Sequence, residues 1–217
     1  MTDAREPTER TRLRRAHDRG RFDQETVYRI LDAMPLCHVG FMLNGAPSVL
    51  PTLQWREGDN VYWHASRAGR GVKAQVGHEV CLTVTLLDGM VLARSAFHHS
   101  ANYRSVMIFG KPRIIEDPKI KREKFKNLIE HLYPGRWNTL RPVTDQETKA
   151  TTVLSLPIAE ASAKIRSGGP IDDEQDYELP IWAGVLPLYY ARGEIEPDER
   201  NAPGVEMPAE LDAFSIG

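Results

Sequence analysis

The sequence has little cysteine and no long hydrophobic run, and each absence excludes a class of protein. Of its 217 residues only Cys37 and Cys81 are cysteines, and each lies inside an apolar run. Two isolated cysteines give neither a disulfide framework nor the ligand spacing of a metal site. No apolar run approaches the roughly 20 residues of a membrane-spanning helix, and the first residues lack the apolar core of a secretory signal. We therefore expect a cytoplasmic protein with free, buried thiols and no metal site.

An excess of charge of one sign is also missing. The 28 Lys and Arg residues nearly balance the 30 Asp and Glu residues, so no overall field attracts nucleic acid or an anionic membrane. The charge is uneven, because residues 1–23 hold seven arginines against five acids and residues 193–217 hold seven acids against one arginine. Such blocks are typical of solvated or interacting tails. We predict a flexible basic arm over residues 1–20, one folded domain over 21–190 and an acidic tail over 191–217.

The residues that are present predict short strands at hairpin spacing and two amphipathic helices. The helices are expected at Gln24–Met34 and Pro118–Leu132, with Asp23 and Asp117 as caps, because each segment places its apolar side chains on one face. The crossovers of a parallel α/β fold are absent, so the expected fold is mainly β, a small antiparallel barrel with helices at its ends. Turns are expected at Asn44-Gly45 and Asp88-Gly89. The predicted strands are Leu36–Leu43, Ala46–Trp55, Val61–His64, Val80–Leu87, Met90–Arg94, Tyr103–Ile115 and Thr152–Ile158. The last of these can continue, with a bulge, through Arg166.

The loop after the strand Val61–His64 is the first candidate site. It is small, basic and contains glycine, and it leads into a short expected helix, Val72–Val76. A strand, a glycine-bearing loop and a helix start bring backbone N–H groups, a hydroxyl and cations together, which suits a phosphate. The candidate donors are Ser66, Arg67, Arg70 and Lys73. The alternative is a solvated loop whose arginines serve solubility.

Four stretches, taken in order, resemble a known family. They are Arg19–Asp23 before the first helix, Cys37–Pro51, Val61–Ala65 with Gly69 and Lys73, and a fourth set formed by Asn102–Val106, Phe109-Gly110, Lys164–Arg166 and Trp182–Pro187. This order resembles the pyridoxamine 5′-phosphate oxidase-like split β-barrel family of FMN-binding proteins. More narrowly, it is similar to the flavin-nucleotide-binding branch that contains the nitroimidazole-resistance (Nim) proteins. The resemblance implies an antiparallel, Greek-key-like barrel.

The resemblance also implies where a flavin would lie. The FMN phosphate would meet Arg70 and Lys73 with help from Ser66. The ring would lie along two strands, and Trp182 would approach it across a homodimer interface. The strand residues that the resemblance assigns to the cofactor are Val49, Leu50, Pro51, Thr52, Tyr62, Trp63, His64, Ala65 and Ser105.

Three further side chains are candidates for roles beside the cofactor. His64 matches the histidine that Nim-type proteins place there, and as a neutral imidazole it could donate a proton to a reduced substrate. The alternative for His64 is a hydrogen-bonded histidine at a strand end. Lys164 and Arg166 alternate around Ile165 and so point to one side of a strand. That side either faces the flavin, where cations stabilise the reduced anion, or forms a solvated edge.

The resemblance implies an FMN-dependent oxidoreductase that acts as a homodimer on a small substrate such as a nitroaromatic or a quinone. FAD and deazaflavin are alternative flavins. The strand Ser48–Thr52 lacks the cation of the biosynthetic oxidase, which argues against oxidation of pyridoxine phosphate. Two other hypotheses remain at this point. One is a haem-binding or haem-degrading protein with His64, His98 or His99 as axial ligand, and the other is a non-catalytic flavin carrier or redox sensor.

Overall fold

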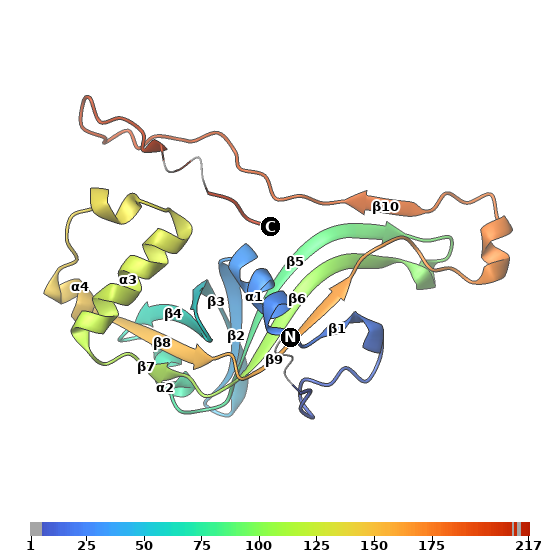
Figure 1. Cartoon of the computed structure of the whole chain (residues 1–217), viewed down its shortest axis with the longest axis horizontal. Coiled ribbons are helices and arrows are strands. Elements are labelled where there is room, and N and C mark those ends of the chain that lie inside the picture. The colour runs from blue at the N-terminus through green and yellow to red at the C-terminus, as the bar shows by residue number, and fades with distance from the viewer. Residues whose placement is uncertain (1–5, 210, 212–213) are drawn as a thin grey trace.

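The computed structural model describes residues 6–209, 211 and 214–217, and its strands form one antiparallel sheet (Figure 1). The sheet order is β1-β9-β6-β5-β2-β3-β4-β8-β7, with β10 paired to β5. The mainly β fold that the sequence predicts is therefore confirmed. The strands are β1 (Gly20–Arg21), β2 (Leu36–Leu43), β3 (Ala46–Glu57), β4 (Asn60–Ser66), β5 (Val80–Leu92), β6 (Ser100–Gly110), β7 (Arg113–Ile114), β8 (Thr151–Pro157), β9 (Glu160–Arg166) and β10 (Gly184–Pro187).

Four α-helices and four short 3₁₀-helices accompany the sheet in the described residues. The side chain of Asp23 accepts a hydrogen bond from the backbone of Thr26, and the side chain of Asp117 accepts two from the first turn of its helix, so both predicted caps are confirmed. The helices are α1 (Gln24–Ala33), α2 (Arg70–Gln75), α3 (Pro118–Leu132), α4 (Asp145–Ala150), η1 (His17–Arg19), η2 (Ala96–His98), η3 (Arg136–Thr139) and η4 (Glu174–Glu178).

Two hydrophobic clusters lie on opposite faces of β4. The larger fills the barrel and includes Trp63, Leu82 and Ile108, with α1 packed against it. The smaller lies beneath α3, where Trp55 and Tyr62 stack with ring centroids 5.6 Å apart. Because successive side chains of a strand point to opposite faces, Trp63 and Tyr62 enter different clusters. β4 is therefore anchored on both sides.

The barrel opens where β3 leaves β4. The β3–β4 ladder joins Gln54–Glu57 to Asn60–Trp63, while Ala46–Leu53 pairs only with β2. The last residues of β4, His64 to Ser66, pair with β8 alone. Beyond these pairs no ladder joins β3 to β4 in the described residues, and we call this break between the two strands the split.

Three sequence predictions about strands are wrong. The predicted strand Tyr103–Ile115 is two strands, β6 and β7, which lie at separate places in the sheet order. Asp88-Gly89 does not form a turn, because β5 continues through it to Leu92 with a register shift between Leu87 and Gly89. A Cβ on Gly89 would lie 3.0 Å from the carbonyl oxygen of Leu186. The absence of a side chain at Gly89 therefore allows β10 to approach β5 closely. The third error concerns Thr152–Arg166, which is not one bulged strand but the two strands β8 and β9, on opposite sides of the sheet order.

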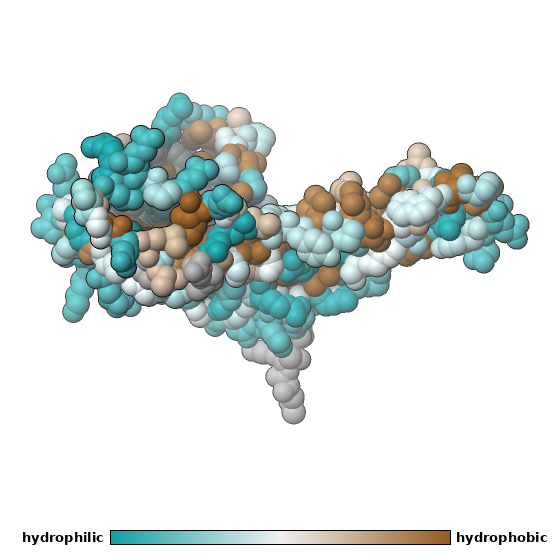
Figure 2. All heavy atoms as spheres, turned by 90° about the horizontal axis from the view of Figure 1, so that it is seen from above, coloured by the Kyte–Doolittle hydropathy of each residue, from teal (hydrophilic) through white to brown (hydrophobic). Residues whose placement is uncertain are grey.

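The outer parts of β5 and β6 form an arm that projects from the body and carries β10 (Figure 1). Hydrophobic side chains lie along this arm at the surface (Figure 2). They include Met90, Trp182 and Leu186, and Trp182 is 72% exposed. Beyond Pro187 an exposed segment returns over the body, and the backbone N–H of Gly217 donates to the carbonyl of Ala33 over 2.9 Å.

The N-terminal region, where the sequence predicts a flexible arm, contacts the body from Thr8 onward. Arg10 pairs with Glu79 over 2.8 Å and also with Glu160, and its guanidinium lies over the ring of Phe109. Thr11 is buried. The first five residues of the predicted arm, and residues 210 and 212–213 of the predicted tail, lie outside the described residues. No helix in the described part of the chain is long and apolar enough to cross a membrane.

Candidate functional site

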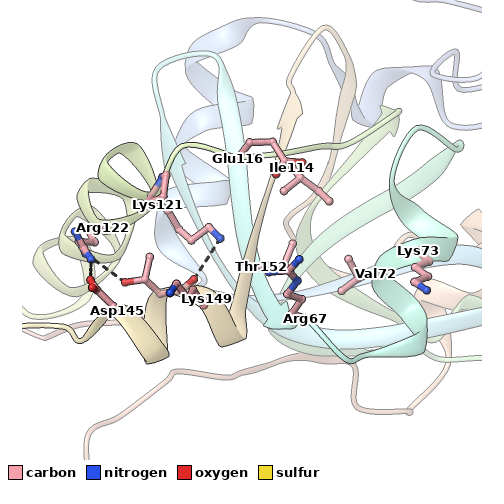
Figure 3. A pocket seen from close by; sticks show the side chains of 12 residues that line it. Arg67, Val72, Lys73, Ile114, Glu116, Lys121, Arg122, Asp145, Lys149 and Thr152 are labelled. Carbon is pink, nitrogen blue, oxygen red and sulfur yellow. Dashed lines mark hydrogen bonds and ion pairs between the residues drawn. The ribbon is translucent and has the colours of Figure 1, made fainter.

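A cation-rich cavity of about 540 Å³ lies between the loop after β4, the strands β7 and β8, and the first turns of α3 and α4 (Figure 3). Two carboxylates, Glu116 and Asp145, also line it. The five cationic side chains of the lining are Arg67, Lys73, Lys121, Arg122 and Lys149. Five cations against two carboxylates make the cavity suited to an anion.

The cations of the cavity differ in what they already bind. Lys121 donates to the carbonyls of Thr148 and Thr151 over 3.3 and 3.1 Å, and Arg122 pairs with Asp145. These contacts fasten α3 to α4. For Arg67, Lys73 and Lys149 the described part of the chain provides no side-chain hydrogen bond or ion pair, and all three are exposed. These three are the cations available to a bound anion.

The predicted phosphate loop is divided between two hollows. Lys73 borders the cationic cavity and also a neighbouring hollow that Arg70 lines. Ser66 ends β4, and its carbonyl accepts the N–H of Gly69 over 2.8 Å. A Cβ on Gly69 would lie 2.9 Å from that carbonyl oxygen, so the turn requires glycine. In a single chain, Lys73 is joined by Arg67 in the cationic cavity and by Arg70 in the neighbouring hollow.

His64 lies at the split with an unsatisfied ring atom. Its Nδ1 is buried, and no partner for it is found among the described residues. Burial lowers the pKa of the imidazole below its ordinary value of 6.5, so the ring is neutral at pH 7. A buried polar atom without a partner is costly. A ligand in the split that hydrogen-bonds this atom would remove the cost.

The predicted strand residues divide by the face on which they lie. Val49 and Pro51 are exposed on the outer face of β3, and Val49 is 66% exposed. Leu50 packs against the barrel core, and Thr52 alternates onto the same inner side.

On β4 the predicted residues Tyr62 and Trp63 are core residues. Tyr62 is covered by α3, and the Nε1 of Trp63 donates to the Oε1 of Gln75 over 3.1 Å. Ala65 also packs against the core. The side chains of Tyr62, Trp63 and Ala65 are therefore unavailable. At the split, β4 presents the His64 ring and the backbone edge from His64 to Ser66, which the β3–β4 ladder does not reach.

Arg166 is already used within the chain, against the hypothesis that it faces a cofactor. It is 7% exposed, and it donates to the side chain of Asn102 and to the carbonyls of Gly168 and Gly169. The sequence shows only that Lys164 and Arg166 share a side. Burial by the loop after β9 comes from the tertiary structure.

The remaining predicted residues lie away from the cationic cavity. The hydroxyl of Ser105 donates to the carbonyl of Lys164 over 3.3 Å, and the Nζ of Lys164 lies 6.0 Å from the ring centroid of Tyr103. Trp182 precedes β10 on the projecting arm. In one chain the structure therefore does not bring Trp182 to the cavity.

His98 and His99 lie between β5 and β6, at the tip of the arm. The Nε2 of His98 is 3.5 Å from a carboxylate oxygen of Asp173, and the Nδ1 of His99 is 2.9 Å from the carbonyl oxygen of Ser95. Within the described ranges no cluster of three His, Cys, Asp or Glu side chains could hold a metal ion.

The sequence analysis missed Lys121, Arg122 and Lys149. They come from α3 and α4, and nothing local to either helix indicates that both pack beside the loop after β4. Their only sequence signal is the strong cap of each helix, which predicts the helices but not their positions.

Comparisons with known proteins are consistent with this geometry. Residues 23–165 match the family model of pyridoxamine 5′-phosphate oxidase. The structure of the flavocytochrome Anf3 from Azotobacter vinelandii is 53% identical, covers 98% of this chain and 100% of its own, and superposes with a TM-score of 0.95. The FAD and haem binding protein from Mycobacterium smegmatis is 32% identical, with 91% and 98% coverage and a TM-score of 0.86.

A more distant similarity concerns nitroimidazole resistance. A proposed 5-nitroimidazole antibiotic resistance protein from Bacteroides thetaiotaomicron is 26% identical, with a TM-score of 0.55, and covers 66% of this chain and 84% of its own. No curated protein sequence matches the chain.

Proposed function

Because this chain belongs to the pyridoxamine 5′-phosphate oxidase-like split-barrel family, we propose that it is a flavin-dependent redox protein that carries haem as a second cofactor. The observation that carries the proposal is the 53% identity to a flavocytochrome over almost the whole of both chains. The FAD and haem binding relative supports it independently. The nitroimidazole-resistance relative that the sequence pattern favours is less similar than either.

The cationic cavity supports a flavin nucleotide. Arg67, Lys73 and Lys149 are exposed cations without partners in the described chain, and charge-assisted hydrogen bonds to phosphate are among the strongest in proteins. FAD is favoured over the FMN expected from the sequence, because a relative that covers 91% of this chain binds FAD. In this proposal the cavity holds the phosphates and the split holds the ring.

The residues of the split then act by binding and orienting. The unpaired backbone edges of β3 and β4 provide N–H and C=O groups in fixed directions, and His64 provides a neutral imidazole. A flavin held there would supply two-electron and one-electron redox chemistry, and a haem would supply one-electron exchange. His64 would hold or deliver a proton at its ring nitrogen.

For the substrate, we propose a small planar molecule such as a quinone or a nitroaromatic. The exposed apolar surface at Val49 and Pro51 on the outer face of β3 supports this class. Oxidation of pyridoxine phosphate is not part of the proposal, because Ser48–Thr52 has no cation to bind the substrate phosphate.

The proposal is tested on protein purified from haem-replete cells. The expected absorption spectrum has a flavin band near roughly 450 nm and a haem Soret band near roughly 400 nm, both set by the chromophores. Mass spectrometry of the released cofactors should identify FAD. Protein that takes up neither flavin nor haem, even after incubation with each, would contradict the proposal.

A further inference from the structure

A second cavity, of about 500 Å³, lies on the outer face of β2 and is separate from the cationic one. Its walls are mainly apolar and aromatic, formed by Leu36 and Leu53 of the sheet, Tyr133 after α3, and Phe214 and Ile216 near the C-terminus. Of the described residues on its wall, His38 alone has an imidazole. We call this space the His38 cavity.

The C-terminal segment of the chain forms one side of the His38 cavity. The rings of Tyr133 and Phe214 stack with centroids 5.5 Å apart and planes 27° from parallel. Gly217 is fixed by its hydrogen bond to Ala33, and Tyr190 also lines the wall. Residues distant in sequence thus form an aromatic wall opposite the sheet.

His38 is placed to bind something in this cavity. It lies on β2 between Pro51 of β3 and Thr83 of β5, and its side chain is exposed. Among the described residues, nothing donates to or accepts from the His38 ring. Because no described residue hydrogen-bonds this ring, its nitrogens are available to bind a molecule in the cavity.

Resting on the proposed function, we propose that the His38 cavity is the haem site and that the imidazole of His38 would bind the iron. A porphyrin is a flat, largely apolar ring, and cofactor cavities of 300–1,000 Å³ with few polar groups are typical. Imidazole is a common axial ligand of haem iron. The cavity offers both features together.

The other histidines considered as ligands fit less well. His98 and His99 are on the arm and already face Asp173 and the carbonyl of Ser95. His64 does not line the His38 cavity, and its unsatisfied Nδ1 is assigned above to the flavin in the split.

The test is a haem titration of flavin-loaded protein freed of haem, followed by the Soret band in the ferric and dithionite-reduced states. The variants are His38→Ala and His38→Leu, the latter being sterically close and compatible with a strand. His64→Ala tests the competing ligand. His78→Ala is the matched control, because His78 is an exposed histidine at a different hollow.

Loss of His38 should weaken haem binding by at least 10- to 100-fold, since even loss of a residue that only supports a metal ligand typically costs that much. The spectrum of residual bound haem should lose its histidine-ligated form, and added imidazole should restore it. Flavin content should stay at the wild-type level, which also reports that the variant is folded.

Two results would overturn the inference while the proposed function stands. One is haem binding to both His38 variants with wild-type affinity and spectrum. The other is loss of haem in His64→Ala alone. If the wild-type protein binds flavin but no haem, the inference falls together with the haem part of the proposed function. If it binds neither cofactor, the whole proposed function falls.

Discussion

At the residue scale, the cations of the cavity differ in what they already bind, and this decides which can hold a phosphate. Lys121 and Arg122 are engaged by α4 and the start of β8, so moving either toward a ligand would break existing bonds. Arg67, Lys73 and Lys149 have no such contacts in the described chain. We therefore expect these three cations to dominate nucleotide affinity.

Replacement of Arg67 and Lys73 by alanine should weaken FAD binding by two to three decades. Each charge-assisted hydrogen bond contributes about 1.5–3 kcal/mol to binding. Because two such bonds are not fully additive, losing both should cost about 3–5 kcal/mol of binding free energy. Each 1.4 kcal/mol corresponds to a tenfold change in affinity. Titrations of FAD and riboflavin against both proteins measure the effect. Riboflavin, which lacks the phosphate, should bind both proteins equally.

Two controls accompany this prediction. Arg70→Ala should have a smaller effect, because Arg70 lines the neighbouring hollow. Lys126→Ala, an exposed lysine on α3, should have none. An equal loss of affinity for FAD and riboflavin would mean that Arg67 and Lys73 support the loop and do not bind the phosphate.

His64 should make stability depend on pH. Burial lowers its pKa in the folded state below the ordinary 6.5, so below about pH 6.5 the unfolded state binds more protons than the folded state. Stability therefore falls as pH decreases through that value. The melting temperature of the wild type should drop more between pH 7.5 and pH 5.5 than that of His64→Gln.

The matched control for this measurement is His99→Gln, at an exposed position on the arm, which should keep the wild-type pH dependence. Carboxylates that titrate in the same range are common to all three proteins and cancel in the comparison. A pH dependence of His64→Gln identical to that of the wild type would argue that the His64 ring is solvated.

At the element scale, α3 is the helix that joins the cationic cavity to the smaller core cluster. The first turns of α3 carry Lys121 and Arg122, which line the cavity. Its last turns carry Leu128 and Leu132, which pack in the smaller cluster with Tyr62 of β4. The helix start is fixed by Asp117, which accepts from the N–H groups of Lys119 and Ile120 over 2.7 and 3.1 Å. Both the cavity and the cluster therefore depend on this cap.

Asp117→Ala should lower the free energy of unfolding by about 0.5–2 kcal/mol, the usual cost of removing an N-cap side chain. Urea denaturation measures it. Glu123→Ala, an exposed acidic position on the same helix, should change stability by less than about 0.5 kcal/mol. Equal effects of the two changes would show that the cap contributes nothing beyond its charge.

At the scale of the whole molecule, the projecting arm is difficult to explain in a single chain. Met90 and Leu186 oppose each other in the β5–β10 ladder, and both are exposed. Tyr189 follows in the exposed returning segment and is 86% exposed. Apolar side chains gathered on an extended arm (Figure 2) are typical of a surface that a partner covers. We propose that the partner is a second copy of the chain.

The protein should have twice the mass of one chain in light scattering. Covering the arm should produce an interface of the obligate class, above about 2,000 Å². The pair Met90→Glu and Leu186→Glu should yield monomer, because it places charges in an apolar contact. Lys119→Glu, an exposed charge change on α3, should leave the dimer intact. A monomeric wild type with bound flavin would contradict the proposal.

In such a dimer, Trp182 of one protomer would approach the flavin of its partner, as the family resemblance implies. Its 72% exposure in one chain is consistent with that role, which stays a prediction. Trp182→Ala should then weaken flavin binding without weakening the dimer.

The sequence by itself determined the elements whose signals are local. The strand Leu36–Leu43 and the helix Pro118–Leu132 have the predicted bounds. Asn44 and Gly45 both have positive φ, 51° and 80°, as a two-residue hairpin turn requires. Capping, periodicity and turn chemistry act over a few residues, so a single sequence contains them. The ordered set of such signals also predicts the family, which the comparisons confirm.

Only the tertiary structure decided how these elements meet. It made Asp88-Gly89 part of a long strand instead of the expected turn, because β5 pairs there with both β6 and β10. It buried Arg166 among loop carbonyls and brought Lys149 to the cavity that Lys73 lines. It also placed residues near the C-terminus on one wall of the His38 cavity. These contacts join residues far apart in sequence. Their geometry depends on the packing of the whole sheet, and no local pattern records it.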